Sequence, residues 1–406
     1  MGDLSARLSV GFAWVGHTLM HIVAALYLTV VLALEREWQL PYDELIRLWT
    51  LGALLIGLGA PLAGWLGDRW SDSRMMAVFF LMTGGGAVWA GLADGPDALW
   101  IGLAVLGLGA SIYHPVGMSW MVKNATNRGK SLGYLGLFGS IGVALAAVVA
   151  GGLTELWGWR SAFLIPGGIC VALGLALWGC IAAGLIQDRK GDLKPQPKPS
   201  RGDVVRAFFV LSVTMVCAGL MFNAMQIVLP KLFEERLSDL VGGGTFGIGG
   251  LVTLVWLTAS IPQLIGGHLA DRYPLKRIYA ICLLAQTPLM ALLAVLGGFP
   301  LVGAAAMVVI ASQVQIPAEN LLLARYTPDK HRGLAFGAKF ILSFGAGPVA
   351  VQMAAFFYER FHDFRELYWT LTALALVAFL AALLLPGERK EAATAPTAPQ
   401  PVPAAE

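Results

Sequence analysis

The chain has 406 residues, of which 57% are hydrophobic and only 13% are charged, and its formal net charge is +3. An ordinary soluble domain has about 25% charged residues, so this composition excludes a typical soluble globular protein and indicates an integral membrane protein. The small basic excess does not indicate nucleic-acid binding, because unequal loop charge across a membrane accounts for it.

Twelve continuous apolar runs follow one another along the chain. Each approaches or exceeds the about 20 residues that a helix needs to cross the hydrocarbon core, and the continuous pattern indicates helices rather than alternating strands. Because the first run lacks a small-residue cleavage site, we expect it to remain in the membrane as a span. The predicted spans cover residues 8–34, 46–66, 75–93, 98–122, 131–154, 161–185, 204–231, 245–270, 277–297, 300–324, 333–358 and 366–386.

A polar stretch separates the sixth run from the seventh. Residues 187–203 contain several lysines and prolines, a composition typical of a linker. The sequence therefore predicts an all-α polytopic membrane protein with an N-terminal six-helix bundle (1–186), a cytoplasmic linker (187–203) and a C-terminal six-helix bundle (204–386). Residues 387–406 are rich in Ala, Pro and Thr, and we expect a disordered cytoplasmic tail there.

Basic residues are unequally distributed between the two sides of the predicted spans. With the N-terminus inside, the inner loops and termini hold about three times as many Lys and Arg residues as the outer loops, and cytoplasmic loops are the ones that retain such residues. We therefore expect both termini in the cytoplasm. The expected location is the inner (plasma) membrane of a bacterium, with the chain as a monomer in the lipid bilayer.

A short phrase occurs twice, each time between two apolar runs. Asp68 and Arg69 follow Gly64 in the first copy, and Asp271 and Arg272 occupy the same place 203 positions later. An Arg-Gly-x-x-x-Gly phrase also recurs, beginning at residues 128 and 332, so the halves of the chain are repeats of each other. Internal repetition in an apolar chain is typical of secondary transporters.

The repeated phrase resembles the hallmark of the major facilitator superfamily, which lies between helices two and three and again between eight and nine. The resemblance covers the whole chain and implies twelve transmembrane helices in two pseudo-symmetric bundles, with spans one, four, seven and ten around a central cavity. Small residues between Gly142 and Gly151 are similar in spacing to a phrase of facilitator exporters. The stretch from Ile112 to Pro115 resembles the fosmidomycin-resistance type of exporter.

The two copies of the phrase are expected to form a cytoplasmic gate. A carboxylate at a helix end can pair with a nearby arginine, and such a contact can hold one conformation and release it in another, or can simply fix a loop. The predicted gate residues are Asp68, Arg69, Arg128, Asp271, Arg272 and Arg332.

Polar side chains inside the apolar runs are expected to face a wet interior, because they are costly in hydrocarbon. They concentrate in the spans that, by resemblance, line the cavity. The candidate substrate-binding residues are Trp14, His17, His21, Tyr113, His114, Asn223, Gln226, Gln313, Gln315 and Glu319. Proline frees carbonyl groups and allows bending, so we expect interrupted helices at Pro115, Pro230, Pro262, Pro317 and Pro348.

His17 and His21 are four residues apart and therefore share one face of the first helix. Such a pair can bind a metal ion, but no carboxylate or cysteine accompanies it in that helix, so neither a metal site nor a cofactor is expected. Three roles stay open for the pair: hydrogen bonding between helices, substrate contact and proton relay, the last because histidine titrates near physiological pH.

Glu319 is the acidic residue that lies within a predicted span and cannot be assigned to a loop. Lys339, in the eleventh run, is the basic residue at a comparable depth in its span. An ion pair between them would make both tolerable inside the membrane and could be purely structural. Alternatively, Glu319 takes up and releases a proton during a transport cycle.

These features predict a secondary active transporter that moves a small organic solute by alternating access, with proton-coupled export as the leading interpretation. The alternatives are a proton-coupled uptake permease and a non-transporting membrane sensor built on the same fold. An enzyme is not expected, because the loops contain no nucleophile elbow, phosphate loop or metal-ligand set. With no cluster of arginines in the spans, the polar residues favour an amphiphilic or zwitterionic solute.

Overall fold

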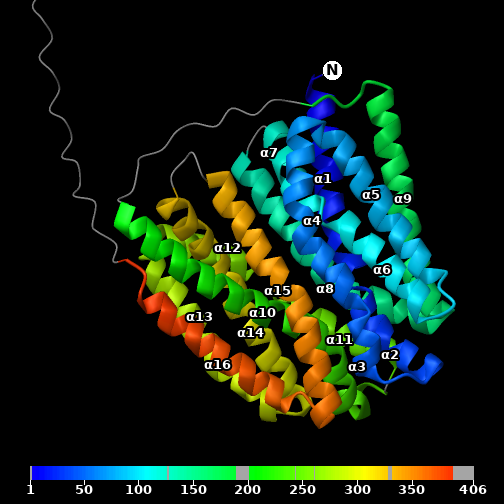
Figure 1. Ribbon diagram of the computed structural model, residues 1–406, viewed down its shortest axis with the longest axis vertical. Coiled ribbons are helices and arrows are strands. Elements are labelled where there is room, and N and C mark those ends of the chain that lie inside the picture. The colour runs from blue at the N-terminus through cyan, green and yellow to red at the C-terminus, as the bar shows by residue number, and fades with distance from the viewer. Residues whose placement is uncertain are drawn as a thin grey trace, which may run out of the picture.

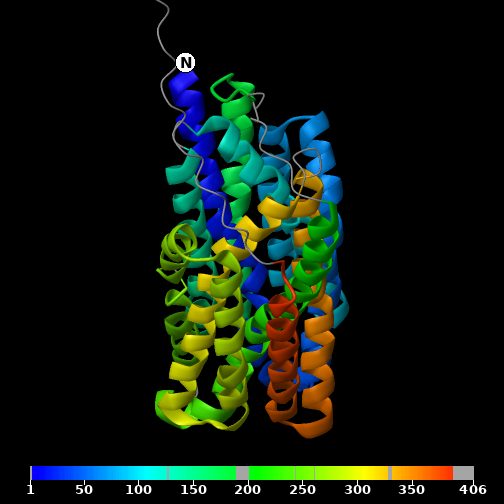
Figure 2. The same ribbon diagram turned by 90° about the vertical axis from the view of Figure 1, so that its left-hand side faces the viewer.

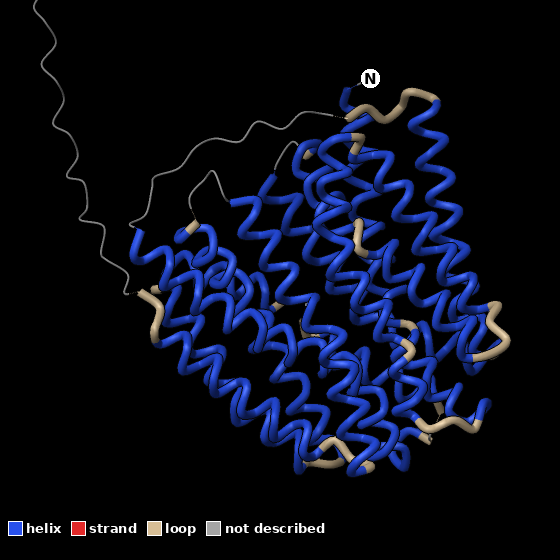
Figure 3. Tube along the Cα trace, viewed as in Figure 1, coloured by secondary structure: helices blue, strands red, loops and turns tan. Residues whose placement is uncertain are grey.

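The computed structural model describes residues 2–125, 128–188, 201–242, 244–259, 261–327 and 332–386, and within these ranges every regular element is a helix (Figure 3). The predicted tail, residues 387–406, and residues 189–200 of the predicted linker lie outside them.

The first half of the chain supplies six spans. Its helices are α1 (Gly2–Ala25), α2 (Tyr27–Trp38), α3 (Tyr42–Arg47), α4 (Trp49–Arg69), α5 (Asp72–Gly91), α6 (Pro96–Ala110), the π-helical turn η1 (Tyr113–Gly117), α7 (Met118–Asn124), α8 (Arg128–Trp157) and α9 (Trp159–Ala182). The second half supplies six more. Its helices are α10 (Arg201–Val241), α11 (Thr245–Leu257), α12 (Pro262–Arg272), α13 (Leu275–Val295), α14 (Gly298–Tyr326), α15 (Arg332–Phe361) and α16 (Arg365–Leu383).

Eleven helical segments among the described residues are long and apolar enough to cross a membrane, some of them joining consecutive elements such as α1 and α2. Helix α5, with 20 residues packed between α6 and α9, is the twelfth span of the fold. The predicted all-α architecture of twelve transmembrane helices in two six-helix bundles is therefore confirmed. The largest difference is at α10, which runs to Val241 rather than ending near residue 231.

Two of the five proline-bearing spans are interrupted, and three are not. Pro115 lies within η1, and Pro262 begins α12 after a break that follows Leu257. Pro230, Pro317 and Pro348, by contrast, lie inside the helices α10, α14 and α15, which continue past them, so no break in the helix occurs there. A helix tolerates such a proline when its neighbours satisfy the freed backbone groups.

The two halves lie side by side, with α1–α9 on one side and α10–α16 on the other (Figure 1). Helix α8 packs against α11, and α4 packs against α15, so these two contacts join the halves. At the α8–α11 crossing, a Cβ on Gly151 would lie 2.2 Å from the Thr245 carbonyl oxygen, and one on Gly249 would lie 2.4 Å from that of Ala147. Only glycine, which has no Cβ, allows the two backbones to come this close.

Two ends of the molecule are distinguished here by the loops that they carry. The N-face holds the N-terminus and the turns after α4 and α12, and the distal face holds the turns after α2 and α8 (Figures 1 and 2). The helices run between these two faces, which are therefore the two membrane surfaces.

Candidate functional site

A cavity of about 70 Å³ lies between the two halves of the chain. Both halves contribute to its wall, and the polar side chains on it are two histidines from the first half and two amides from the second. Spans one, four and seven line it as expected, and spans two and eleven line it although they were not expected to. Span ten, which was also expected to line it, contributes none of the described lining residues. The lining residues are Met20, His21, Ala24, Leu28, Trp49, Ala53, Ile56, His114, Asn223, Gln226, Ile227 and Gly347.

Three histidines meet beside this cavity. His17 and His21 come from α1, and the π-helical turn η1 brings His114 to them, with ring centroids 5.4 Å from His17 and 5.6 Å from His21. The Nε2 atoms of His17 and His21 are 3.3 Å apart, and His17 Nδ1 lies 2.7 Å from the Leu135 carbonyl oxygen. We call His17, His21 and His114 the histidine cluster. Each of the three histidines was a candidate residue from the sequence, but their proximity to one another was not predicted.

Two other candidates from the first half support the cluster rather than line the cavity. The Tyr113 hydroxyl donates to the Ala13 carbonyl oxygen at 2.6 Å, and its ring stacks on His17 with centroids 4.8 Å apart. Trp14 donates from Nε1 to the Ser131 carbonyl oxygen at 3.3 Å and stacks on Phe138. Both aromatic side chains therefore fix α1 against its neighbours.

The second half places its amides on the opposite wall. Asn223 donates through Nδ2 to the carbonyl oxygens of Gly219 at 2.7 Å and Ser343 at 3.2 Å. Because both donor positions are used, the Asn223 side-chain oxygen is the atom that can accept a hydrogen bond from a solute. Gln226 lies one turn further along α10 and lines the same cavity.

Glu319 does not line the cavity; it lies inside the second half, where its residue is 5% exposed. Lys339 Nζ is 2.7 Å from Glu319 Oε1, so the ion pair considered from the sequence is present. The Tyr279 hydroxyl lies 2.9 Å from Glu319 Oε2, and Gln315 Nε2 lies 3.4 Å from the same atom. Gln313 is also buried, and Gln315 accepts a hydrogen bond from Gln286 at 2.8 Å.

The N-face differs in detail from the predicted gate. Asp68 is exposed, with Lys123 Nζ 3.9 Å away, whereas the neighbouring Asp72 is buried and lies 2.8 Å from the same nitrogen. Arg69 lies over the ring of Trp65. Of the remaining gate residues, Asp271 and Arg272 lie at the end of α12, and the side chains of Arg128 and Arg332 lie outside the described residues. Asp72 was not among the gate residues predicted from the sequence.

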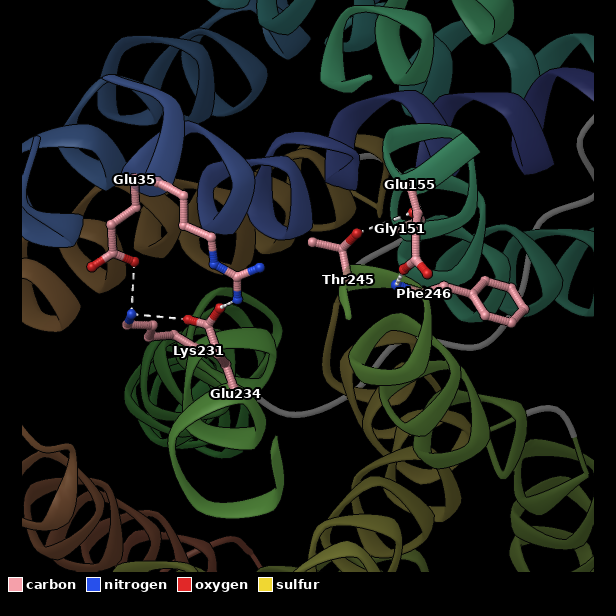
Figure 4. Close-up of polar contacts among 8 residues, drawn as sticks. Glu35, Gly151, Glu155, Lys231, Glu234, Thr245 and Phe246 are labelled. Carbon is pink, nitrogen blue, oxygen red and sulfur yellow. Dashed lines mark hydrogen bonds and ion pairs between the residues drawn. The ribbon is translucent and has the colours of Figure 1, made fainter. Parts of the chain in front are cut away.

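The distal face carries charged contacts between the halves that the sequence analysis missed. Lys231 in α10 lies 2.6 Å from Glu35 in α2 and 2.9 Å from Glu234, and Arg36 pairs with Glu234 (Figure 4). We call Glu35, Arg36, Lys231 and Glu234 the distal ion cluster. None of these four residues was among the site residues predicted from the sequence, so their pairing across the halves was not anticipated.

Further contacts hold the halves together on this face. Arg47 donates to Glu359 at 2.6 Å and to Gln352 at 2.7 Å. The backbone N–H of Phe246 donates to Glu155 at 3.0 Å, beside the α8–α11 crossing (Figure 4). The distal face is therefore closed by polar contacts on both sides of the cavity.

The family model described as Major Facilitator Superfamily matches residues 13–259 and 211–406. Among curated relatives, the probable 4-methylmuconolactone transporter of Cupriavidus pinatubonensis is 31% identical over 140 residues, covering 32% of this chain and 32% of that protein. The multidrug transporter QDR2 of Candida glabrata is 27% identical over 164 residues, covering 38% of this chain and 28% of that protein. The matches therefore span about a third or less of the relatives' length.

Two kinds of solved structure are similar to the whole fold. A bacterial homologue of the human lysosomal transporter Spinster, inward-facing and unoccupied, superposes with a TM-score of 0.68 at 14% identity, covering 94% of this chain and 95% of that one. The peptide transporter POT in complex with sulfate superposes with a TM-score of 0.74 at 15% identity, covering 93% of each chain. At these identities the likeness concerns the fold.

Proposed function

The chain belongs to the Major Facilitator Superfamily and is a multi-pass membrane transporter, and we propose that it is a secondary active transporter that exports a small organic solute in exchange for protons. The observation that carries the proposal is the cavity between the two halves, beneath a distal face that polar contacts close. Alternating access requires a central site of this kind and contacts that can break when the halves rock.

The loop charges support an orientation for this machine. The predicted inner loops and termini hold most of the basic residues, and under the positive-inside rule this supports our proposal that both termini and the 187–203 linker lie in the cytoplasm. The distal face then points outward, and the state described here is the one closed to the outside. We assign residues 1–186 and 204–386 to the two rocking bundles of a monomer in a bacterial inner membrane.

The cavity wall favours a mainly apolar solute with a few hydrogen-bonding groups. Its polar groups are the imidazoles of His21 and His114 and the amides of Asn223 and Gln226, set among aliphatic and aromatic side chains. No lysine or arginine is among the described lining residues, which disfavours a multiply charged phosphate ester. 4-Methylmuconolactone and drugs, the solutes for which two relatives are named, would both suit such a wall.

The buried titratable side chains of the chain favour the proton as the coupled ion. Glu319 is buried and within reach of Lys339 and Tyr279, so protonation of its carboxylate would weaken the attraction between α14 and α15. His17 and His21 offer a second place for a proton next to the cavity. Coupling requires only that one of these groups changes protonation state between the two conformations.

A two-step experiment tests the proposal. A thermal-shift screen of metabolites and drugs first finds solutes that stabilise the purified protein, because a ligand that binds only the folded state raises its apparent stability. Flux of a stabilising solute is then measured in proteoliposomes with the proton gradient imposed in either direction. Movement against the direction of proton flow supports export, and movement with the protons indicates uptake. Tight binding without flux under any gradient would favour the sensor.

A further inference from the structure

We propose that the histidine cluster is a binding site for one divalent first-row transition metal ion of the Zn²⁺ class. The cluster brings three imidazoles together from two separate segments, and imidazole is the side chain that Zn²⁺, Ni²⁺ and Cu²⁺ bind most readily in proteins. One potential ligand atom from each of the three residues lies within 4.8 Å of the others. Three histidines with one open position form a known kind of zinc site.

The distance between the first two ligands already fits such an ion. In a tetrahedral site with bonds of about 2.0–2.1 Å to nitrogen, two ligand atoms are about 3.3–3.4 Å apart. The Nε2 atoms of His17 and His21 are 3.3 Å apart. One ring nitrogen of His114 lies within 4.8 Å of a ring nitrogen of each of the other two histidines, so an approach of about 1.5 Å would complete the set, a shift within reach of a side-chain rotation.

The hydrogen bonds around the cluster prepare His17 as a ligand. Its Nδ1 lies 2.7 Å from the Leu135 carbonyl oxygen and must donate to it, so in the neutral ring Nε2 carries the lone pair and is the ligand atom. A ligating histidine usually makes just such a bond through its other nitrogen, which fixes the ring and raises its basicity. His21 Nε2 is then the donor to His17 Nε2, and the ion replaces that bond when the His21 proton moves to Nδ1.

The backbone positions the cluster in two further ways. A Cβ on Gly139 would lie 2.4 Å from His17 Cε1, so only glycine lets α8 come this close to the imidazole. The π-helical turn η1 carries His114, and π turns within α-helices occur frequently at functional sites because they re-aim a side chain. His21 and His114 line the cavity, so the open coordination position faces it.

This placement has a consequence for the solute, which rests on the proposed transport function. The described lining of the cavity holds no carboxylate, no lysine and no arginine. A bound divalent ion would supply positive charge there, and a carboxylate or other oxygen donor of the solute could fill the fourth position. The bound ion would thereby favour anionic solutes over neutral ones.

Zinc binding to the full chain, purified without a histidine tag, tests the site directly. We expect isothermal titration with ZnCl₂ to give one ion per chain, MgCl₂ to give no binding, and Co²⁺ to give the visible absorption bands of a tetrahedral complex. His21→Gln and His114→Gln should each weaken Zn²⁺ binding by more than about 100-fold, because loss of an outer-shell partner alone costs 10–100-fold.

The matched control is His268→Gln with His362→Gln, since both side chains are exposed and lie far along the chain from the cluster. Equal Zn²⁺ affinity in the control and in the wild type supports the cluster, whereas weaker binding in the control would assign the ion to the surface. Should a cluster variant fail to give a monodisperse protein, His17→Gln provides the third test. Zinc binding that survives all three cluster variants, or absence of zinc binding to the wild type, overturns the proposal and leaves the transport function untouched.

Discussion

Lys339 Nζ lies 2.7 Å from Glu319 Oε1, and this ion pair ties α15 to α14 inside the second half of the chain. Both side chains are largely buried, at 12% and 7% exposed, so the pair is insulated from the solvent that weakens surface pairs. A pair of this kind is costly to break by removing one partner, because the other charge is then left buried.

Replacing Glu319 therefore affects both stability and coupling. For Glu319→Gln we expect a loss of about 3 kcal/mol or more, seen as a lower melting temperature, because Lys339 loses its counter-charge. We also expect transport of an identified solute to lose its dependence on the proton gradient. Undiminished coupling would remove Glu319 from the mechanism. The matched control is Glu366→Gln, which breaks an exposed pair with Arg365 and should cost less than about 1 kcal/mol.

The distal ion cluster should control which face is open. Lys231→Met leaves Glu35 and Glu234 without their shared cation, so we expect the population to shift toward the state that is open at the distal face. Trp70 and Tyr273 are exposed residues on the N-face, in different halves of the chain. Spin labels attached to Trp70→Cys and Tyr273→Cys should therefore come closer together, because the N-face closes when the distal face opens. An unchanged distance distribution would show that the cluster does not hold the halves together.

The labelling background and control follow from the same structure. Cys170, Cys217 and Cys282 are buried and Cys180 is partly buried, so replacing Cys180 is the first step toward specific labelling. Arg365→Gln changes a charge whose pair lies within α16 alone, and it should leave the label distance unaltered.

The α8–α11 crossing offers a steric test of rocking. A methyl group on Gly249 would lie 2.4 Å from a backbone oxygen of α8, so Gly249→Ala should prevent the halves from closing at the distal face and reduce transport at least tenfold. A Cβ on the adjacent Gly250 meets nothing within 4 Å, so Gly250→Ala should transport normally. Equal activity of the two variants would mean that this crossing opens little during the cycle.

On the N-face, Asp72 should matter more for stability than the aspartate of the repeated phrase. Asp72→Asn removes the buried partner of Lys123 and should cost about 1.5–3 kcal/mol, the typical value of a charged hydrogen bond. Asp68→Asn should cost less than about 1 kcal/mol, because its carboxylate is 78% exposed and 3.9 Å from Lys123. Thermal unfolding in detergent compares the two, and a larger loss from Asp68→Asn would contradict this ranking.

The sequence predicted the architecture well because a membrane leaves little choice. Continuous apolar runs must form helices to satisfy their backbone groups, and the duplicated phrase located the two bundles. The α10 end was missed because five of the eleven residues 231–241 are charged, which is typical of a loop between membrane spans. In the structure their charges pair across the halves, and residues such as Lys231, Leu232 and Glu234 are good helix formers.

Parts of the site were predictable, and others depended on three-dimensional detail. The Glu319–Lys339 pair could be expected because both stand at a similar depth in neighbouring runs. The meeting of His114 with the α1 histidines could not, because it depends on one π-helical turn that changes the direction of a side chain. The burial of Asp72 rather than Asp68 was equally hidden, because Asp68 lies at the end of α4 and Asp72 begins α5, and the sequence does not show which side of the turn between them faces Lys123.

The α8–α11 crossing is a place where one backbone touches another, at Gly151 and at Gly249. Side chains that interlock must change rotamer whenever their helices move past each other, and each such change adds friction. The glycine contacts themselves have no rotamers to reset. Around them, however, the hydroxyl groups of Thr245 and Thr253 donate to carbonyl oxygens of α8, so α8 and α11 can separate only if these hydrogen bonds break.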